Sequence, residues 1–176
     1  MNTKLRCLTE SDEEAYKNFV KEFEDAGERI IPSTVESDSL SFSDWLERTR
    51  KIVKGIDLPK GWVPATTYSL FNEDENKILG AIDIRHQLNE HLLSVGGNIG
   101  YGVTPSERRK GYASAMLKEV LEICKDMGMN KVLITCNKEN IASAKTIIKN
   151  GGALENEVED EKGNIRQRYW ITLNLI

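Results

Sequence analysis

The segment of residues 103–128, VTPSERRKGYASAMLKEVLEICKDMG, constrains the fold more than any other part of the chain. Its second half places apolar side chains at the spacing of a helix that buries one stripe: Ala113, Met116, Leu117, Val120, Leu121, Cys124 and Met127. A strand pattern at 99–103 precedes this helix, and a short apolar strand at 131–135 follows it. A helix that joins two strands lets them run parallel in one sheet, so we expect parallel pairing at this place.

The strand at 99–103 carries two glycines, Gly100 and Gly102, between its apolar residues. Glycine weakens the interior of a strand, so its presence indicates a bulge, or a close approach by another backbone or a ligand. The following helix starts just beyond the carboxyl end of this strand, where ligands collect in α/β folds. The sequence therefore predicts a binding site at this junction.

The rest of the chain alternates between helical and strand patterns without a linker. Helical spacing occurs at 10–24, 41–55 and 140–151. Strand patterns occur at 63–71, 78–88, 153–158 and 165–176, and a first strand could form at 4–8. This order predicts a single domain, residues 1–176, of the α/β (α+β) class. We expect a mixed, mostly antiparallel central sheet of six to seven strands flanked by about four helices.

Charge and composition argue against several classes of protein. The 24 Lys and Arg residues against 28 Asp and Glu give a formal net charge of -4, whereas a nucleic-acid binder would carry a basic face. No apolar run approaches the ~20 residues that cross a bilayer. Three widely spaced cysteines, Cys7, Cys124 and Cys136, predict neither a disulfide framework nor a zinc site. We therefore expect a cytoplasmic protein that binds no metal, no nucleic acid and no membrane, as a monomer or a homodimer.

Three cations in a row, Arg108, Arg109 and Lys110, precede Gly111 and the start of the long helix. The first N–H groups of a helix lack partners, and its dipole is positive there, so the place suits an anion. Three cations at this end would oppose the dipole and repel one another, which favours a bound pyrophosphate over a merely solvated helix end. The glycine patterns of P-loop NTPases and of dinucleotide-binding folds are both absent from the sequence.

The stretch VTPSERRKGYA resembles the acyl-CoA signature of the GNAT superfamily of N-acyltransferases. Arg108, Gly111 and Ala113 fill the core of that signature, which is Arg or Gln, two residues, Gly, one residue, then Gly or Ala. The later stretch TCNKENIASAKTIIKNGG, residues 135–152, resembles the family's second conserved block. The expected order of elements also matches the GNAT-like acyl-CoA N-acyltransferase fold, from about Lys4 to the end of the chain.

The resemblance implies acetyl-CoA as co-substrate and assigns residues to each part of it. The loop and helix start would hold the pyrophosphate through backbone N–H groups of Arg108, Arg109, Lys110, Gly111, Tyr112 and Ala113. The strand residues Tyr101, Gly102 and Val103 would pair with the pantetheine arm, and Asn140 and Ser143 would contact that arm from the other side. In this family the two parallel strands splay apart, and the thioester lies in the gap.

The catalytic residues are less defined than the coenzyme site. The family often protonates the leaving thiolate with a tyrosine at the position held here by Ile147, so solvent or another tyrosine would have to serve. His86, near the end of a central strand, is a candidate general base, because imidazole can take a proton at neutral pH. The alternative is that His86 packs and hydrogen-bonds at the strand end. Cys136 is expected to be a buried, inert thiol.

We interpret the chain as an N-acetyltransferase that moves an acetyl group from acetyl-CoA to a primary amine by direct attack in a ternary complex. The acceptor could be a small amine, an amino acid, an antibiotic or a protein amine. Two alternatives stay open. The first is a non-catalytic acyl-CoA sensor or regulatory module, which the absence of the usual tyrosine favours. The second is an interaction domain whose cations bind an acidic partner.

Overall fold

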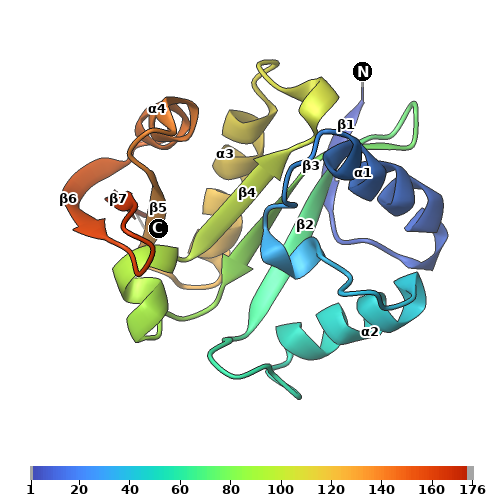
Figure 1. Ribbon diagram of the computed structural model, residues 1–176, viewed down its shortest axis with the longest axis horizontal. Coiled ribbons are helices and arrows are strands. Elements are labelled where there is room, and N and C mark those ends of the chain that lie inside the picture. Colours follow the sequence, from blue (N-terminus) through green and yellow to red (C-terminus); the bar gives the residue numbers. More distant parts are fainter. Residues whose placement is uncertain (1, 174–176) are drawn as a thin grey trace.

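The computed structural model describes residues 2–173, which form two antiparallel sheets (Figure 1). The first sheet has the order β1 (Thr3–Arg6), β2 (Ala65–Asn72), β3 (Lys77–Arg85) and β4 (Ile99–Val103). The second has the order β5 (Lys131–Asn137), β7 (Ile165–Thr172) and β6 (Ala153–Glu159). Residues 174–176, which the sequence placed in the last strand, lie outside the described part.

The expected single sheet of six to seven strands is therefore wrong, and so is the expected parallel pairing of 99–103 with 131–135. Within residues 2–173, β4 and β5 share no ladder. They meet just before β4, where Asn98 N–H donates to Leu133 O at 2.6 Å and Leu133 N–H donates to Asn98 Oδ1 at 2.9 Å. Beyond this joint the two strands belong to different sheets.

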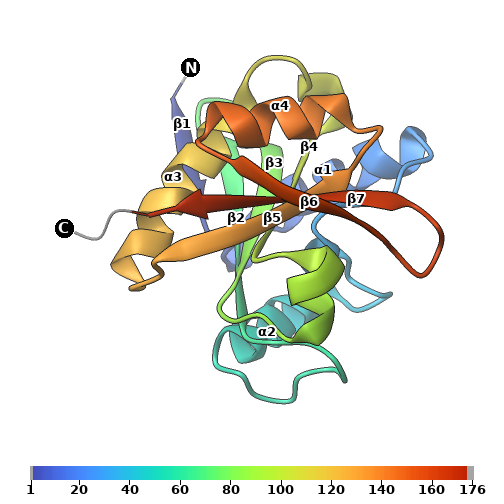
Figure 2. The ribbon, with the colours of Figure 1, turned by 90° about the vertical axis from the view of Figure 1, so that its left-hand side faces the viewer.

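Four α-helices and a five-residue π-helical turn, Leu92–Gly96, accompany the sheets in the described chain: α1 (Glu13–Asp25), α2 (Phe42–Val53), α3 (Tyr112–Asp126) and α4 (Ile141–Lys149). The helices α1 and α2 cover one face of the first sheet, and α3 covers the other (Figures 1 and 2). Most residues of the predicted apolar stripes are buried, but Val53 on α2 is 40% exposed. On α3 the buried stripe includes Met116, Leu117, Val120, Leu121 and Cys124, whereas Met127, the C-cap residue, is 42% exposed.

Two apolar cores result from this layering. One lies between the first sheet, α3, α4 and the second sheet, and it includes Ile82, Ile84, Met116 and Ile147. The other lies under α1 and α2 and includes Phe19, Phe23, Trp45 and Phe71. The strand β3 is buried on both faces, so it is a fixed platform from which side chains near its carboxyl end reach the site.

Candidate functional site

The loop between β4 and α3 has the backbone of an anion cradle. A 3₁₀ turn at Pro105–Glu107 follows β4, and α3 begins at Tyr112. Two residues in the intervening stretch adopt left-handed conformations, Arg109 with φ 63° and Gly111 with φ 91°. A Cβ added to Gly111 would meet no atom within 4 Å, so the space in front of the helix start is open. Left-handed residues next to a helix N-terminus turn successive N–H groups toward one concave place.

Two of the three cations of this loop are paired with carboxylates. Arg108 donates two hydrogen bonds to Glu28, from Nη1 at 2.8 Å and from Nη2 at 2.6 Å. Lys110 Nζ lies 2.8 Å from Glu107 Oε2. Hydrogen bonding from Arg108 lowers the pKa of Glu28. These pairs offset the repulsion among the cations, so the argument that the charge run requires a bound anion is weaker than the sequence indicates. Among the described residues, Arg109 is the one cation of the three without a carboxylate partner.

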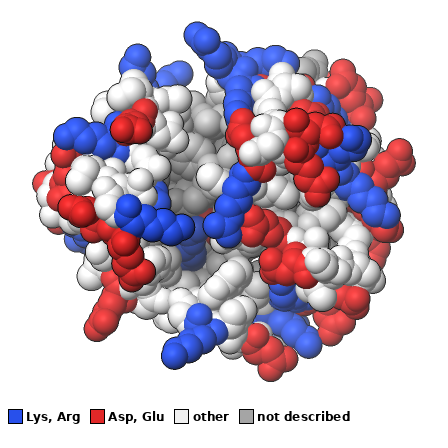
Figure 3. Space-filling model, in the orientation of Figure 1, with Lys and Arg blue, Asp and Glu red and all other residues white. Residues whose placement is uncertain are grey.

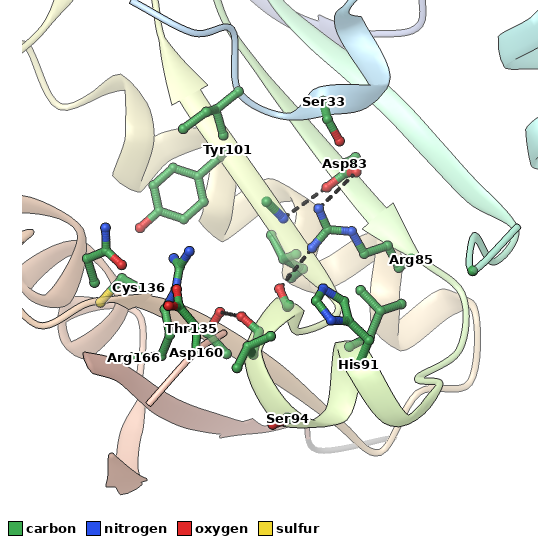
Figure 4. A pocket seen from close by; sticks show the side chains of 18 of the residues that line it. Ser33, Asp83, Arg85, His91, Ser94, Tyr101, Thr135, Cys136, Asp160 and Arg166 are labelled. Carbon is green, nitrogen blue, oxygen red and sulfur yellow. Dashed lines mark hydrogen bonds and ion pairs between the residues drawn. The ribbon is translucent and has the colours of Figure 1, made fainter. Parts of the chain in front are cut away.

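A cavity of about 900 Å³ opens where β4 and β5 diverge. It is lined by residues of β3, β4, β5, the π-helical turn and the start of α4 (Figure 4). In the space-filling view a hollow opens near the middle of the face, with Lys and Arg side chains at its edge (Figure 3). The cavity therefore joins the gap between the two sheets to the outside of the protein.

The π-helical turn forms one wall of the cavity and is hydrogen-bonded to the second sheet. Thr135 Oγ1, on β5, donates to Val95 O at 2.6 Å. Arg168, on β7, donates to Leu93 O from Nη2 at 2.8 Å and from Nε at 3.2 Å. Gly97 closes the turn with φ 72°, and a Cβ at this residue would lie 2.6 Å from Leu133 O. Only glycine therefore allows the turn to seat against β5 at the point where the strands separate.

Tyr101 bridges the gap between β4 and α4. Its hydroxyl lies 2.8 Å from Ser143 Oγ, in a hydrogen bond in which either oxygen could donate. Burial raises the pKa of Tyr101 to about 12, so the phenol keeps its proton at neutral pH. The thiol of Cys136 lines the same space, and burial raises its pKa as well. Cys136 is 4% exposed, as expected for an inert thiol.

A carboxylate and a guanidinium group, those of Asp83 and Arg85, lie side by side on β3 at the wall of the cavity. Asp83 is fully buried, and burial raises the pKa of its carboxyl group. Arg85 Nη2 lies 3.5 Å from Asp83 Oδ2, and Arg85 Nη1 donates to Gly96 O at 2.9 Å. Gly100 N–H donates to Asp83 Oδ1 at 2.9 Å. The two charges thus stabilise each other at the inner end of the cavity (Figure 4).

The turn between β6 and β7 forms the outer rim of the cavity. Asp160 accepts from Asn164 N–H at 2.9 Å, from Lys162 N–H at 2.9 Å and from Arg166 Nε at 3.1 Å. These donors, led by the Asn164 N–H, lower the pKa of Asp160 to about 2. Glu159, Glu161 and Lys162 also line the cavity from this turn.

A model of the GNAT acetyltransferase domain matches residues 2–153 of this chain. The chain belongs to the GNAT acetyltransferase family. A curated relative, the uncharacterized N-acetyltransferase YnaD of Bacillus subtilis, is 31% identical over 88 residues, which are 49% of this chain and 49% of YnaD. The match thus spans about half the length of that relative. Family membership places the chain among acetyltransferases.

Two solved structures share the fold over nearly all of the chain. The ribosomal-protein-S5-alanine acetyltransferase from Vibrio fischeri has a TM-score of 0.75 at 14% identity, with 99% of this chain and 94% of that chain covered. RimL, a ribosomal L7/L12 alpha-N-protein acetyltransferase solved with coenzyme A in a disulfide with a cysteine, has a TM-score of 0.71 at 16% identity, with 100% and 97% covered. At these identities the similarity shows a common GNAT fold.

The residues expected to bind the coenzyme lie at the two ends of one path. Tyr101, Asn140 and Ser143 line the cavity, whereas residues 108–113 form the cradle beyond the carboxyl end of β4. Asn140 caps α4, since its Oδ1 accepts from Ser143 N–H at 3.1 Å. Gly102 and Val103 connect the two places along β4. The backbone of Ile31 lies against Gly102 and leaves no room for a Cβ, which is the close approach that the strand glycines predict.

The two histidines occupy different places. Among the described residues that line the cavity, His86 is absent and His91 is present. The Nε2 atom of His86 lies 2.8 Å from Thr66 Oγ1, its backbone N–H donates to Pro64 O at 2.8 Å, and burial lowers its pKa. His91 is exposed and directly precedes the π-helical turn. The sequence analysis did not single out His91, because it lies in a polar connection between strands. There the hydrophobic periodicity does not indicate which way a side chain points.

Other kinds of site find less support in residues 2–173. This part of the chain has no group of three or more His, Cys, Asp or Glu side chains placed to hold a metal ion. It also contains no helix that is long and apolar enough to span a membrane.

Proposed function

We propose that this GNAT protein transfers an acetyl group from acetyl-CoA to a primary amine by direct attack within a ternary complex. The observation that carries the proposal is the gap between β4 and β5, which opens into a cavity of about 900 Å³. The strand β4 lines this cavity and leads directly into the cradle. The cradle suits the pyrophosphate of a coenzyme, and the gap with its cavity suits a long arm that ends in a thioester. The acceptor is a small molecule or a peptide that reaches the cavity from outside.

The residues of the cradle fit the coenzyme. The open space at Gly111 and the helix start would receive the pyrophosphate, with Arg109 as the unpaired cation beside it. Tyr101, Gly102 and Val103 would present their backbone to the pantetheine arm, and Asn140 and Ser143 would line its other side. The thioester supplies an activated acetyl group, and the protein supplies position and proton transfer.

The reaction forms one bond and breaks another. The lone pair of a neutral amine attacks the carbonyl carbon, the new N–C bond forms, and the C–S bond breaks to release the thiolate. The amine nitrogen loses one proton and the thiolate gains one, so a base and an acid are required. We assign the acid to the hydroxyl pair of Tyr101 and Ser143, which lies at the gap and holds its protons at neutral pH. Tyr101 thereby takes the place of the tyrosine that the family often has where this chain has Ile147.

We assign the base to His91 rather than to His86, because only His91 lines the cavity. Asp83 is fully buried and already bonded to Gly100 N–H, so it cannot reach an incoming amine without rearrangement. Arg85, Glu90, Asp160 and Arg166 share the cavity with His91. Imidazole is the side chain that most often serves as a general base in proteins.

His91→Gln is expected to lower kcat/KM at pH 7 by about 100-fold, a typical contribution of a general base. Initial rates of thiol release at pH 7 measure this effect. His86→Gln is the matched comparison, since it changes the same residue type outside the cavity and retains a partner for Thr66. A loss confined to His86→Gln would return the base to His86 and refute the assignment to His91.

The proposal as a whole is tested by calorimetric titration with acetyl-CoA, beside inorganic pyrophosphate and ATP at the same ionic strength. Saturable one-site binding specific to acetyl-CoA is expected, followed by thiol release when an amine is added. Equal binding of the three polyanions would refute the coenzyme site. Tight binding without turnover of any amine would instead indicate an acyl-CoA sensor. We also propose that the protein works in the cytoplasm, in keeping with its three free cysteines.

A further inference from the structure

Two arginine side chains line the cavity with N–H groups that the protein does not use. Arg85 donates from Nη1 to Gly96 O at 2.9 Å and to Gly97 O at 3.2 Å. Arg166, on β7, is bonded through Nε to Asp160. Across residues 2–173, neither Arg85 Nε nor the two Nη atoms of Arg166 have an acceptor. Since a guanidinium group carries five N–H donors, both side chains can still bind a ligand.

The position of Arg85 is fixed by its surroundings. Gly100 lies opposite Asp83 in the pairing of β3 with β4. A Cβ at Gly100 would lie 2.9 Å from Arg85 Nη2 and 3.0 Å from Asp83 Oδ1. The glycine therefore makes room for the charged pair on the strand that borders the gap. With its side chain 19% exposed, Arg85 is largely desolvated yet reaches the cavity.

The ion pair with Asp83 involves only the Nη2 atom of Arg85, so it leaves other N–H donors of the guanidinium group available. The contact between Asp83 Oδ2 and Arg85 Nη2 is 3.5 Å, longer than a direct hydrogen bond between charged groups. Asp83 takes its short hydrogen bond, 2.9 Å, from the backbone of Gly100 instead. A guanidinium group held in this way can bind a second carboxylate with two parallel hydrogen bonds.

Resting on the function proposed above, we propose that the amine acceptor carries its own carboxylate, as a free amino acid does, and that Arg85 and Arg166 bind that carboxylate. Arg85 lies beside the gap, so a carboxylate bound there brings a neighbouring amine to the thioester. The acidic rim residues Glu90, Glu159 and Glu161 favour the ammonium form as the acceptor enters. The cavity thus has positive groups for the carboxylate of a zwitterionic acceptor and negative groups for its ammonium. The N-terminus of a protein chain lacks this carboxylate.

The test compares each of the 20 L-amino acids with its own α-amide as acceptor, because the amide keeps the side chain and the amine but removes the negative charge. Rates are expressed per neutral amine, since amidation also lowers the pKa of the ammonium group. Thiol release gives kcat/KM, and mass spectrometry identifies the acetylated product. The ratio of acid to amide is independent of the fraction of folded enzyme. We expect a ratio of at least about tenfold for the preferred amino acid, the effect of losing one charged hydrogen-bond pair. A ratio near one would overturn the proposal.

Variants connect this ratio to the two arginines. Arg85→Lys keeps the counter-charge for Asp83 but loses the planar fork, so it should bring the ratio close to one. Arg166→Gln should lower the ratio without removing a partner of Asp83. Arg50→Lys is the matched control, since Arg50 pairs with Glu10 on the surface at 2.7 Å and does not line this cavity. An unchanged ratio in both Arg85→Lys and Arg166→Gln would overturn the proposal.

The outcome also separates this inference from the proposed function. Acetylation of a polyamine or of a peptide N-terminus, with no turnover of any free amino acid, would overturn the carboxylate site and leave the acetyltransferase intact. Failure to bind acetyl-CoA in the calorimetric titration would refute the acetyltransferase itself.

Discussion

Gly111→Glu is expected to weaken acetyl-CoA binding by roughly 1000-fold, which corresponds to about 4 kcal/mol. The side chain would enter the open space in front of α3, where a Cβ meets no atom within 4 Å, so the protein can still fold around it. Its carboxylate would occupy the place assigned to the pyrophosphate and would repel it. The φ of 91° adds backbone strain for any residue with a side chain. Calorimetric titration with acetyl-CoA measures the change.

Gly111→Gln is the control, because it has the same shape and the same backbone strain without the charge. It should weaken binding much less than Gly111→Glu, and both variants should unfold at similar denaturant concentrations. Equal binding by Gly111→Glu and the unmodified protein would show that the coenzyme anion lies elsewhere. Equal losses in the two variants would attribute the effect to shape alone and would remove the electrostatic argument for the cradle.

Gly97→Ala is expected to lower the free energy of unfolding by about 3 kcal/mol, from left-handed strain and from overpacking. Its φ is 72°, and the new Cβ would lie 2.6 Å from Leu133 O, a backbone atom that cannot move independently of β5. The substitution therefore pushes the π-helical turn away from the joint of Asn98 and Leu133. Urea unfolding followed by circular dichroism measures the loss.

Gly27→Ala is the matched control for this prediction. Gly27 has a similar φ of 65°, and a Cβ there would meet no atom within 4 Å. It should cost only the strain term, about 1–2 kcal/mol. A loss in Gly97→Ala no larger than that in Gly27→Ala would mean that the turn and β5 are not in rigid contact.

Local patterns predicted the helices well, and they also predicted the backbone turn before α3. The apolar stripe of α3, from Met116 to Cys124, depends on spacing within one helix, so the sequence alone determines which side faces inward. The cradle is local too, since Gly111 and the helix start are neighbours in the chain. The predicted stripe also included Met127, but this C-cap residue is 42% exposed, and the limits of helices are the part that patterns predict least well.

The features that the sequence could not predict depend on residues far apart in the chain. Glu28 neutralises Arg108 from 80 positions away, so the charge run looked more repulsive than it is. The fold brings Arg85 next to Gly96 and into the same cavity as Arg166, and no local pattern predicts that arrangement. His86 looked more suitable than His91 because strand alternation assigned it a direction, whereas the direction of a loop side chain follows from the folded turn.

The division into two sheets also escaped prediction, for a related reason. A strand, a helix and a second strand favour a parallel pair, and this rule is correct for most sheets. Here the joint at Asn98 uses a side-chain oxygen in place of a backbone acceptor, and Tyr101 reaches across to Ser143 beyond it. Hydrophobic periodicity cannot predict where side-chain hydrogen bonds replace the backbone hydrogen bonds of a sheet.

The turn between β6 and β7 supports itself, with Asp160 accepting hydrogen bonds from Lys162, Asn164 and Arg166. Its neighbours Glu159 and Glu161 can therefore change without disturbing the path of the chain. This turn lies beyond residue 153, where the match to the family ends, and far along the chain from the cradle. Under the proposed function, substitutions at a few rim residues would change the acceptor and leave the residues proposed to bind the coenzyme unaltered.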